Sequence, residues 1–535
     1  MHLGKKIATL AMIGAMAVSA LFAKPVYAAE KPAYLKSVTY FGDEWPINYW
    51  GSEDKNMAAN FEKIKADGFN SIILVVPWRE FQPNNATQEF NPVAFERLKT
   101  VMNCANDHGL WVVLRIGYSW DYYGKAELPP RFAGIVRHNG ADRSAWLRYC
   151  DEIYKTVSQY PNFHSGFITW EDFWDYVHNM GRDYNIKQRK QMAWVSGYQE
   201  YLEKHYSLEY VSEKYNEEFE NFSEVYLPYR QMEATELFYE FYDQMLNGLL
   251  AQSQTVFPGL SMEVRADADP VYRKDGSMYY YSHDITYPCD GADYSALMYS
   301  VSMGQRNESD RISAGAALAA MNQNMNALVS MSGKKYYAEQ LLYMDSTAQF
   351  SYNTQILEEE TDDFVRALSP VLQNTTMGYG LWVYRNYVNN CVYNGQFGLG
   401  TTGWIFYGRS ALEEVNGTPM ARVDEYATIG QKLYGRLSAS EKVYVEFYAQ
   451  PEAGRANVKV ILGNDEQEVK VTSGGTYKVE FPWTGNYDLK ITSDRRAYVD
   501  DIRVYTYEQY GRVYDKEGNE QDLADDFRIL NSQLP

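Results

Sequence analysis

The sequence has 535 residues, 45% of them hydrophobic, which is too long for one ordinary domain and enough for a large core. Its formal net charge of −20 disfavours nucleic acid and anionic lipid as partners, because both are themselves negative. The 48 Tyr and 12 Trp residues present flat faces with polar edges, which suit stacking on sugar rings as well as an aromatic core.

The N-terminus has the pattern of an export signal. Lys5 and Lys6 precede an apolar run, residues 7–23, and small residues ending in Ala28 follow at the cleavage positions. We therefore expect residues 1–28 to be a cleaved signal peptide. The mature chain is expected to be secreted and to make no membrane contact.

Between residues 33 and 436 short β-rich runs alternate with helical patterns. The strands are predicted at residues 37–41, 71–76, 110–116, 164–170, 259–265, 293–299, 335–339 and 377–384. The run SIILVV at 71–76 is apolar throughout, as expected for a strand covered on both faces. Residues 177–257 are predicted to be mostly helical. Eight strands separated by helices predict an α/β fold, a (β/α)8 TIM barrel.

The pattern changes near residue 438. Six short runs of period two follow, separated by turn signals such as Gly474-Gly475, which predicts an antiparallel β-sandwich over residues 438–508. The sandwich is interpreted either as a structural cap or as a carbohydrate-binding-like module. Residues 509–535 are predicted to be a loosely ordered tail.

Four cysteines are widely spaced. Cys104 and Cys150 fall on consecutive predicted helices and could pair, but four free thiols are an equally good interpretation. The sequence lacks G-x-G-x-x-G after an early strand, G-x-S-x-G and H-E-x-x-H. We expect no metal and no organic cofactor.

Two glutamates follow predicted strands of the barrel. Glu171 comes after strand four and Glu339 ends strand seven, and strand ends of a barrel meet at its C-terminal mouth. Glycoside hydrolysis with retention needs such a pair, one carboxyl to protonate the leaving oxygen and one to attack the anomeric carbon. We therefore predict Glu171 as acid/base and Glu339 as nucleophile.

Other residues near the strand ends are predicted to bind substrate. Arg115 and Arg265 leave apolar runs and are expected to pair with carboxylates at the mouth, because a buried arginine without a partner is costly. The aromatic residues that end strands could form a stacking floor or belong to the core. The predicted binding residues are Trp78, Arg115, Tyr118, Trp170, Asp172, Arg265, Tyr299, Gln340 and Trp382.

The sequence resembles the clan-A glycoside hydrolases, and within them the family 42 β-galactosidases. The resemblance rests on YFGDEWPINYW at residues 40–50, on residues 197–228, on AEQ at 338–340 and on residues 378–400. It implies a barrel enzyme that retains configuration, with Glu171 as acid/base and Glu339 as nucleophile. Clan-A enzymes usually carry Asn before the acid/base, and here that position is Trp170.

The first hypothesis is a secreted retaining β-glycoside hydrolase, β-galactosidase-like, acting on oligo- or polysaccharide. The second is a catalytically silent barrel that binds glycans, which Trp170 favours. The third is an inverting or transglycosylating barrel enzyme. The sequence leaves the sugar, the linkage and the oligomeric state open.

Overall fold

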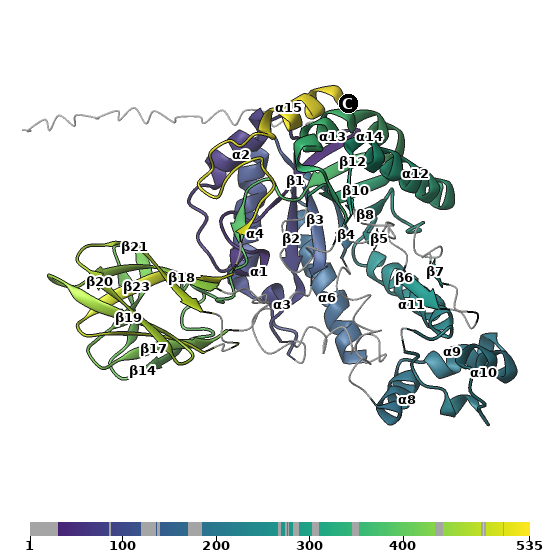
Figure 1. Cartoon of the computed structure of the whole chain (residues 1–535), viewed down its shortest axis with the longest axis horizontal. Coiled ribbons are helices and arrows are strands. Elements are labelled where there is room, and N and C mark those ends of the chain that lie inside the picture. Colours follow the sequence, from purple (N-terminus) through teal and green to yellow (C-terminus); the bar gives the residue numbers. More distant parts are fainter. Residues whose placement is uncertain are drawn as a thin grey trace, which may run out of the picture.

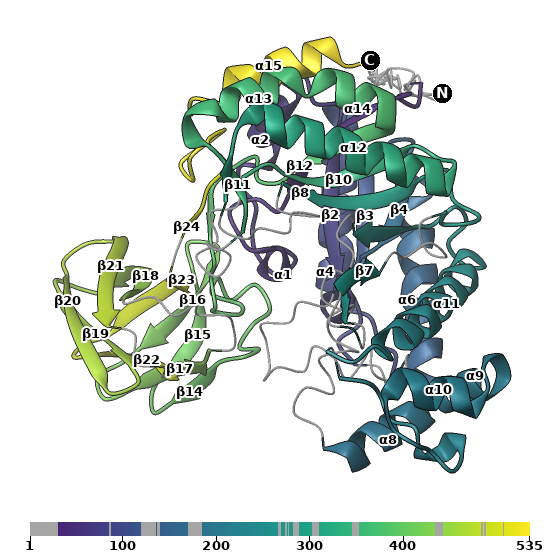
Figure 2. The ribbon, with the colours of Figure 1, turned by 45° about the vertical axis from the view of Figure 1, so that its right-hand side comes forward.

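The computed structural model describes residues 30–535 apart from 85–86, 119–134, 136–139, 170–184, 230, 266–268, 273–274, 276–277, 282–287, 302–309, 345–352, 434–441, 483–484, 486–487 and 507. The predicted signal peptide therefore lies outside the described residues. Figures 1 and 2 show a barrel with a β-sandwich beside it.

Eight parallel strands close into a barrel in the order β1-β12-β10-β8-β5-β4-β3-β2. They are β1 (Leu35–Tyr40), β2 (Ser71–Pro77), β3 (Trp111–Tyr118), β4 (Phe163–Ile168), β5 (Ser261–Arg265), β8 (Ser295–Ser300), β10 (Tyr336–Leu342) and β12 (Thr376–Leu381). All eight predicted strands are confirmed. Each residue of β2 is buried, as the uninterrupted apolar run requires in a strand covered on both faces.

Helices surround the barrel strands (Figure 2). The larger ones are α2 (Met57–Ala66), α4 (Pro92–Asp107), α6 (Gly140–Val157), α11 (Thr235–Gln254) and α12 (Ala314–Ser332). Shorter helices are α1 (Pro46–Tyr49), α3 (Trp78–Phe81), α13 (Thr361–Ala367) and α14 (Ser369–Thr375). In α4, Asn91 caps the first turn and Pro92 opens it, while Phe95, Leu98 and Met102 form the buried stripe.

The described part of the long segment after β4 is helical, as predicted. It contains α8 (Ile186–Val195), α9 (Tyr198–His205), α10 (Leu208–Tyr215) and the 3-10 turn η1 (Phe222–Glu224) before α11 begins. Two short strand pairs lie outside the barrel sheet. The antiparallel pair is β6 (Asp269–Tyr272) with β7 (Met278–Tyr281), and the parallel pair is β9 (Arg311–Ile312) with β11 (Gln355–Ile356), which is followed by η3 (Glu358–Glu360).

The sandwich consists of two five-stranded sheets. One has the order β14 (Ile405–Tyr407), β17 (Thr428–Lys432), β22 (Asp488–Ser493), β19 (Ala456–Leu462), β20 (Asp465–Val471). The other has β15 (Ala411–Val415), β16 (Thr418–Val423), β23 (Ala497–Tyr505), β18 (Lys442–Pro451), β21 (Gly475–Pro482). Alternate residues of β19 are buried, the pattern of a strand with one face on the core.

Two predicted boundaries are wrong. The sandwich begins at β14 and not at residue 438. Strands β16 and β17 pair with its later strands β23 and β22, and β15 and β14 pair in turn with β16 and β17. Residues 509–535 are also not a loose tail. They contain α15 (Ala524–Gln533), which packs against α13 at the end of the barrel where the strands begin (Figures 1 and 2).

Polar contacts hold this C-terminal helix to the barrel. Arg528 Nε donates to Asp67 Oδ1 at 2.7 Å, and the Tyr514 hydroxyl donates to Asp67 Oδ2 at 2.8 Å. Asn531 Nδ2 donates to the Asp67 carbonyl oxygen at 2.9 Å. The short pair β13 (Tyr387–Val388) with β24 (Glu508–Gln509) brings the chain after the sandwich back to the barrel.

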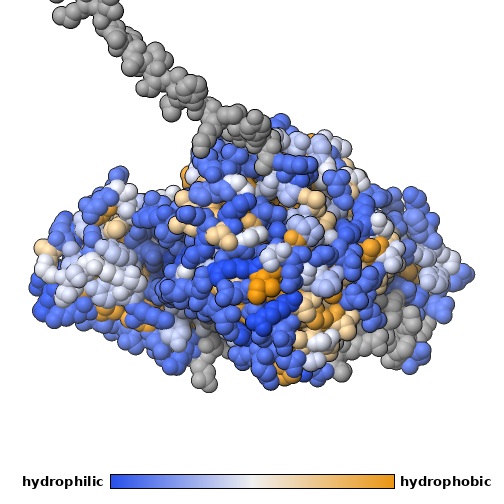
Figure 3. All heavy atoms as spheres, turned by 90° about the horizontal axis from the view of Figure 1, so that it is seen from above, coloured by the Kyte–Doolittle hydropathy of each residue, from blue (hydrophilic) through white to orange (hydrophobic). Residues whose placement is uncertain are grey.

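All four cysteines carry free thiols, so the structure contains no Cys104–Cys150 bridge. Among the described residues no helix is both long enough and apolar enough to cross a bilayer. Hydrophilic residues cover most of the face seen in Figure 3.

Candidate active site

The interior of the barrel is layered. Leu35, Ile73, Val113, Phe167 and Tyr337 pack together in one apolar cluster with Tyr294 and Ala296. In a strand, the residue two positions further points to the same side. The next layer toward the C-terminal mouth therefore includes Arg115 from β3, Thr169 after β4 and Glu339 from β10. These side chains lie where barrel enzymes place their chemistry.

Arg115 is the centre of this polar layer. Its side chain is 1% exposed, and it donates from Nη2 to Glu263 Oε2 at 2.9 Å and from Nη1 to Gln340 Oε1 at 2.7 Å. Nε donates to the Thr169 hydroxyl oxygen at 3.1 Å, and that hydroxyl donates to Glu263 Oε2 at 2.8 Å. The expectation that Arg115 pairs with carboxylates is confirmed.

Glu339 lies beside this arginine. Its carboxylate is fully buried, and Oε2 is 3.9 Å from Arg115 Nη1. At that distance the positive guanidinium attracts the negative carboxylate. The strand extends to Leu342, so Glu339 lies within β10 and not at its last residue, which corrects the predicted bounds of strand seven.

Consecutive residues Glu339 and Gln340 both reach Arg115, although neighbours in a regular strand point to opposite sides. The pairing of β10 shifts register at this point against both neighbours, β8 and β12, which indicates a β-bulge. On β12, a Cβ added to Gly380 would lie 2.1 Å from the Glu339 carbonyl oxygen. A glycine is therefore required for the close approach of the two backbones.

Glu263 and Thr169 belong to this candidate site and were not predicted. Glu263 lies on β5 and is fully buried. The signal that identified Arg115, one charged residue inside an apolar strand, also marks Glu263 in GLSMEVR. Thr169 carries no such signal, because a threonine at the end of a strand is ordinary.

The predicted aromatic residues divide between two environments. Trp78 is 2% exposed and packs on Trp146 and Tyr149 of α6, with ring centroids 5.2 and 6.2 Å apart, so it belongs to the core. Tyr299 is also buried, and burial raises its pKa. Neither offers an open face for stacking on a sugar.

Trp382 lies at the C-terminal mouth, directly after β12. It contacts Phe41, Trp45 and Tyr387, with ring centroids 5.6, 6.2 and 5.9 Å away. We call these four residues the mouth aromatic cluster. Phe41, Trp382 and Tyr387 are buried, and Trp45 is the partly buried member of the cluster.

The remaining predicted residues lie outside what the structure describes. Glu171, Trp170 and Asp172 fall in 170–184. Tyr118 and Arg265 are the last residues of β3 and β5, and only their backbone positions are described. Within the described ranges, no group of three or more His, Cys, Asp or Glu side chains is arranged to hold a metal ion.

Residues 26–131 match the family model described as Cellulase (glycosyl hydrolase family 5). The matched segment spans β1 to β3 and includes Arg115. It supports glycosidase activity and the broader resemblance to clan A, whereas the narrower resemblance to family 42 is not confirmed. A comparison with curated proteins finds no match.

The similarity to solved structures is low. A variant of GH5_18 from Streptomyces cattleya, in complex with Manβ1-4GlcNAc, is 13% identical over 66% of this chain and 71% of that chain, with a TM-score of 0.41. The exo-β-1,4-mannosidase of Opitutaceae bacterium strain TAV5 is 10% identical over 66% and 52%, with a TM-score of 0.41. A β-galactosidase from the psychrophilic Marinomonas ef1 is 10% identical over 66% and 54%, with a TM-score of 0.44.

Proposed function

We propose that this chain is a secreted, retaining β-glycoside hydrolase in which Glu339 is the nucleophile and Glu171 the acid/base. The observation that carries the proposal is the buried Glu339 carboxylate 3.9 Å from Arg115, inside the C-terminal half of a closed parallel barrel. The family match to glycosyl hydrolase family 5 supports the class of reaction.

The reaction runs in two displacements. A Glu339 carboxylate oxygen bonds to the anomeric carbon while the bond to the leaving oxygen breaks, and Glu171 gives that oxygen its proton. Water then attacks the anomeric carbon, Glu171 accepts a proton from the water, and the bond to Glu339 breaks. The Glu339 carboxylate begins and ends the cycle beside the Arg115 guanidinium.

Buried contacts also fix the position of the nucleophile. Glu263 and Thr169 hold Arg115, and Arg115 in turn contacts Glu339 and Gln340. We assign Glu263 as a positioning residue, because its contact with the nucleophile runs through the arginine. This network orients Glu339 before substrate binds, as electrostatic catalysis requires.

The candidate substrates are β-linked sugars. The sequence resemblance to family 42 favours β-galactosides, and the cellulase family model favours β-glucosides. The first experiment is therefore hydrolysis of a panel of aryl β-glycosides, followed by proton NMR of the first-formed product. Retention gives the β anomer first, and a first product of α configuration would contradict the mechanism.

Variants test the assigned residues. Glu339→Gln is expected to lower kcat by on the order of 10⁴-fold or more, as expected when a nucleophile is lost. Glu468→Gln, an exposed position on β20, is the matched control and is expected to leave kcat unchanged. Full activity of Glu339→Gln would refute the proposal.

A second candidate function is a catalytically silent glycan-binding barrel. Trp170 favours it, since it stands where clan-A enzymes usually carry Asn. It predicts saturable sugar binding with no turnover of any aryl glycoside. Secretion is tested separately: protein recovered from the culture medium is expected to begin at residue 29.

A further inference from the structure

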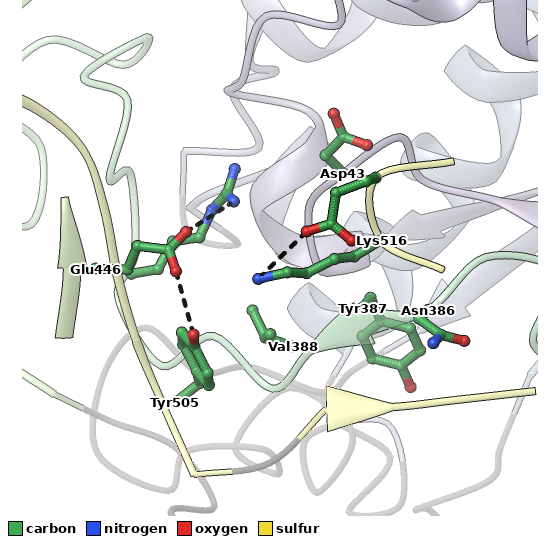
Figure 4. Close-up of a pocket in the computed structure, with 9 residues that line it drawn as sticks. Asp43, Asn386, Tyr387, Val388, Glu446, Tyr505 and Lys516 are labelled. Carbon is green, nitrogen blue, oxygen red and sulfur yellow. Dashed lines mark hydrogen bonds and ion pairs between the residues drawn. The ribbon is translucent and has the colours of Figure 1, made fainter. Parts of the chain in front are cut away.

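A polar pocket lies between the barrel and the sandwich, outside the site described above. It has a volume of about 150 Å³. Asp43 from the loop after β1 and Tyr387 from the segment after β12 line one side, and Glu446 of β18 and Tyr505 of β23 line the other (Figure 4). Lys516, from the chain after the sandwich, also lines it.

The acidic side of the pocket is held in place by hydrogen bonds. The Tyr505 hydroxyl donates to Glu446 Oε2 at 3.2 Å, and Arg503 Nη1 is 4.0 Å from Glu446 Oε1. Arg503 Nη2 is bound to Glu44 Oε1 at 3.0 Å and to Asp501 Oδ1 at 3.1 Å. Glu446 therefore presents a fixed carboxylate, since its neighbours are themselves anchored.

Lys516 supplies the opposite charge. Its Nζ is 3.9 Å from Glu517 Oε1, which is too long for a hydrogen bond, so that contact leaves the ammonium donors able to bind a ligand. In Figure 4 the lysine extends from the side of Asp43 toward the side of Glu446. Asp43 is paired with Arg385 Nη1 at 2.7 Å and keeps its position.

The mixed lining selects against charged and apolar ligands. Asp43, Glu446 and Glu517 disfavour an anion, while Arg503 and Lys516 disfavour a metal cation. An apolar ligand would leave these groups without hydrogen-bond partners. A neutral molecule with several hydroxyls satisfies both kinds of group, because a hydroxyl donates to a carboxylate and accepts from an ammonium. The volume suits about one sugar ring and is below that of sites for larger ligands.

The pocket shares a wall with the mouth of the barrel. Tyr387 lines the pocket and belongs to the mouth aromatic cluster, with its ring 5.3 Å from Trp45 and 5.9 Å from Trp382. Phe41, Trp382 and Tyr387 are buried, whereas Trp45 is only partly buried. Trp45 is therefore the ring of this cluster on which a sugar unit can stack between the mouth and the pocket.

We infer that this pocket is a distal sugar-binding site, built jointly by the barrel and the sandwich. It binds one unit of an oligosaccharide whose reacting unit lies at Glu339, and in that respect the inference rests on the proposed function. The sandwich is thereby part of substrate recognition and more than a cap on the barrel.

The test measures oligosaccharide binding to the full chain carrying Glu339→Gln, by titration calorimetry. The probes are β-1,4-linked gluco-, manno- and galacto-oligosaccharides, from disaccharide to hexasaccharide. A second substitution in this chain, Lys516→Met or Glu446→Gln, is expected to weaken the binding of the longer probes by about tenfold, because each removes one charge-assisted hydrogen bond. The shortest probe that binds is expected to lie in the barrel alone, so its affinity should not change in these variants.

Lys470→Met, at an exposed position on β20, is the matched control and is expected to change no affinity. Equal affinity of all variants for every probe, or no binding of any probe, overturns the inference. If the wild-type chain hydrolyses glycosides while Lys516 and Glu446 prove irrelevant, only the distal site fails. If it hydrolyses nothing but binding depends on Lys516 and Glu446, the proposed catalysis fails and the sugar site stands.

Discussion

Replacing Arg115 by methionine tests the polar layer of the barrel most sharply. Arg115 is 1% exposed and donates hydrogen bonds to Glu263, Gln340 and Thr169. Methionine keeps most of the volume but removes the charge, which leaves the fully buried Glu263 carboxylate uncompensated. Removing one partner of a buried ion pair costs about 3–5 kcal/mol of unfolding free energy.

The companion variant combines Arg115→Met with Glu263→Leu. Because the second change removes the carboxylate that the first leaves without its cation, the double variant is expected to be more stable than Arg115→Met alone, with a coupling free energy of about 1–3 kcal/mol. Urea unfolding followed by tryptophan fluorescence measures both, using the transition assigned to the barrel.

Two results would refute this reasoning. The first is a loss below about 1 kcal/mol in Arg115→Met, which would mean that the ion pair is not desolvated. The second is a double variant less stable than the single one. Activity should fall in both variants, since each removes the guanidinium next to Glu339.

Three further predictions concern the surrounding structure. Gly380→Ala would place a Cβ 2.1 Å from the Glu339 carbonyl oxygen. We therefore expect it to lower the free energy of unfolding by about 1–3 kcal/mol or more in urea, and to lower kcat. Gly315→Ala is the control and should cost nothing, because its added Cβ would meet no neighbouring element within 4 Å. Arg528→Met removes a hydrogen-bond donor to the buried Asp67 and should lower the free energy of unfolding by about 1.5–3 kcal/mol. Arg495→Met, at an exposed position, should lower it little. Equal losses in the two variants would contradict a stabilising role for the contacts of the C-terminal helix. Burial raises the pKa of Asp500 to about 7, so between about pH 4 and 7 the folded state holds a proton that the unfolded state releases. The free energy of unfolding therefore falls as pH rises from about 4 toward 7. Asp500→Asn should reduce that fall, and identical slopes of unfolding free energy against pH in the wild type and the variant would contradict this.

The barrel could be predicted because eight β-rich runs alternate with helical patterns, and because β2, which is buried along its whole length, is an unbroken apolar run. The first strands of the sandwich could not, because β15 is only partly buried along its length and shows no clear alternation. The helix α15 carries Phe527 and Leu530 on one face, yet a short helix in a polar segment gives a weak signal.

The candidate site, like the fold, could be predicted only in part. The ends of parallel strands meet at one face, which is why Arg115 and Glu339 could be expected to converge. The register shift that also turns Gln340 toward Arg115 depends on how β10 packs against its neighbours, including Gly380 of β12. No local pattern in residues 336–342 encodes that contact.

The central claim, that Glu339 attacks the anomeric carbon, is tested most directly by trapping the glycosyl-enzyme. The chain is incubated with 2-deoxy-2-fluoro glycosyl fluorides, its intact mass is measured, and the labelled peptide is mapped. We expect one added glycosyl unit, located on Glu339. An adduct on a different carboxylate such as Glu263, or turnover of the panel with no adduct, would contradict the mechanism.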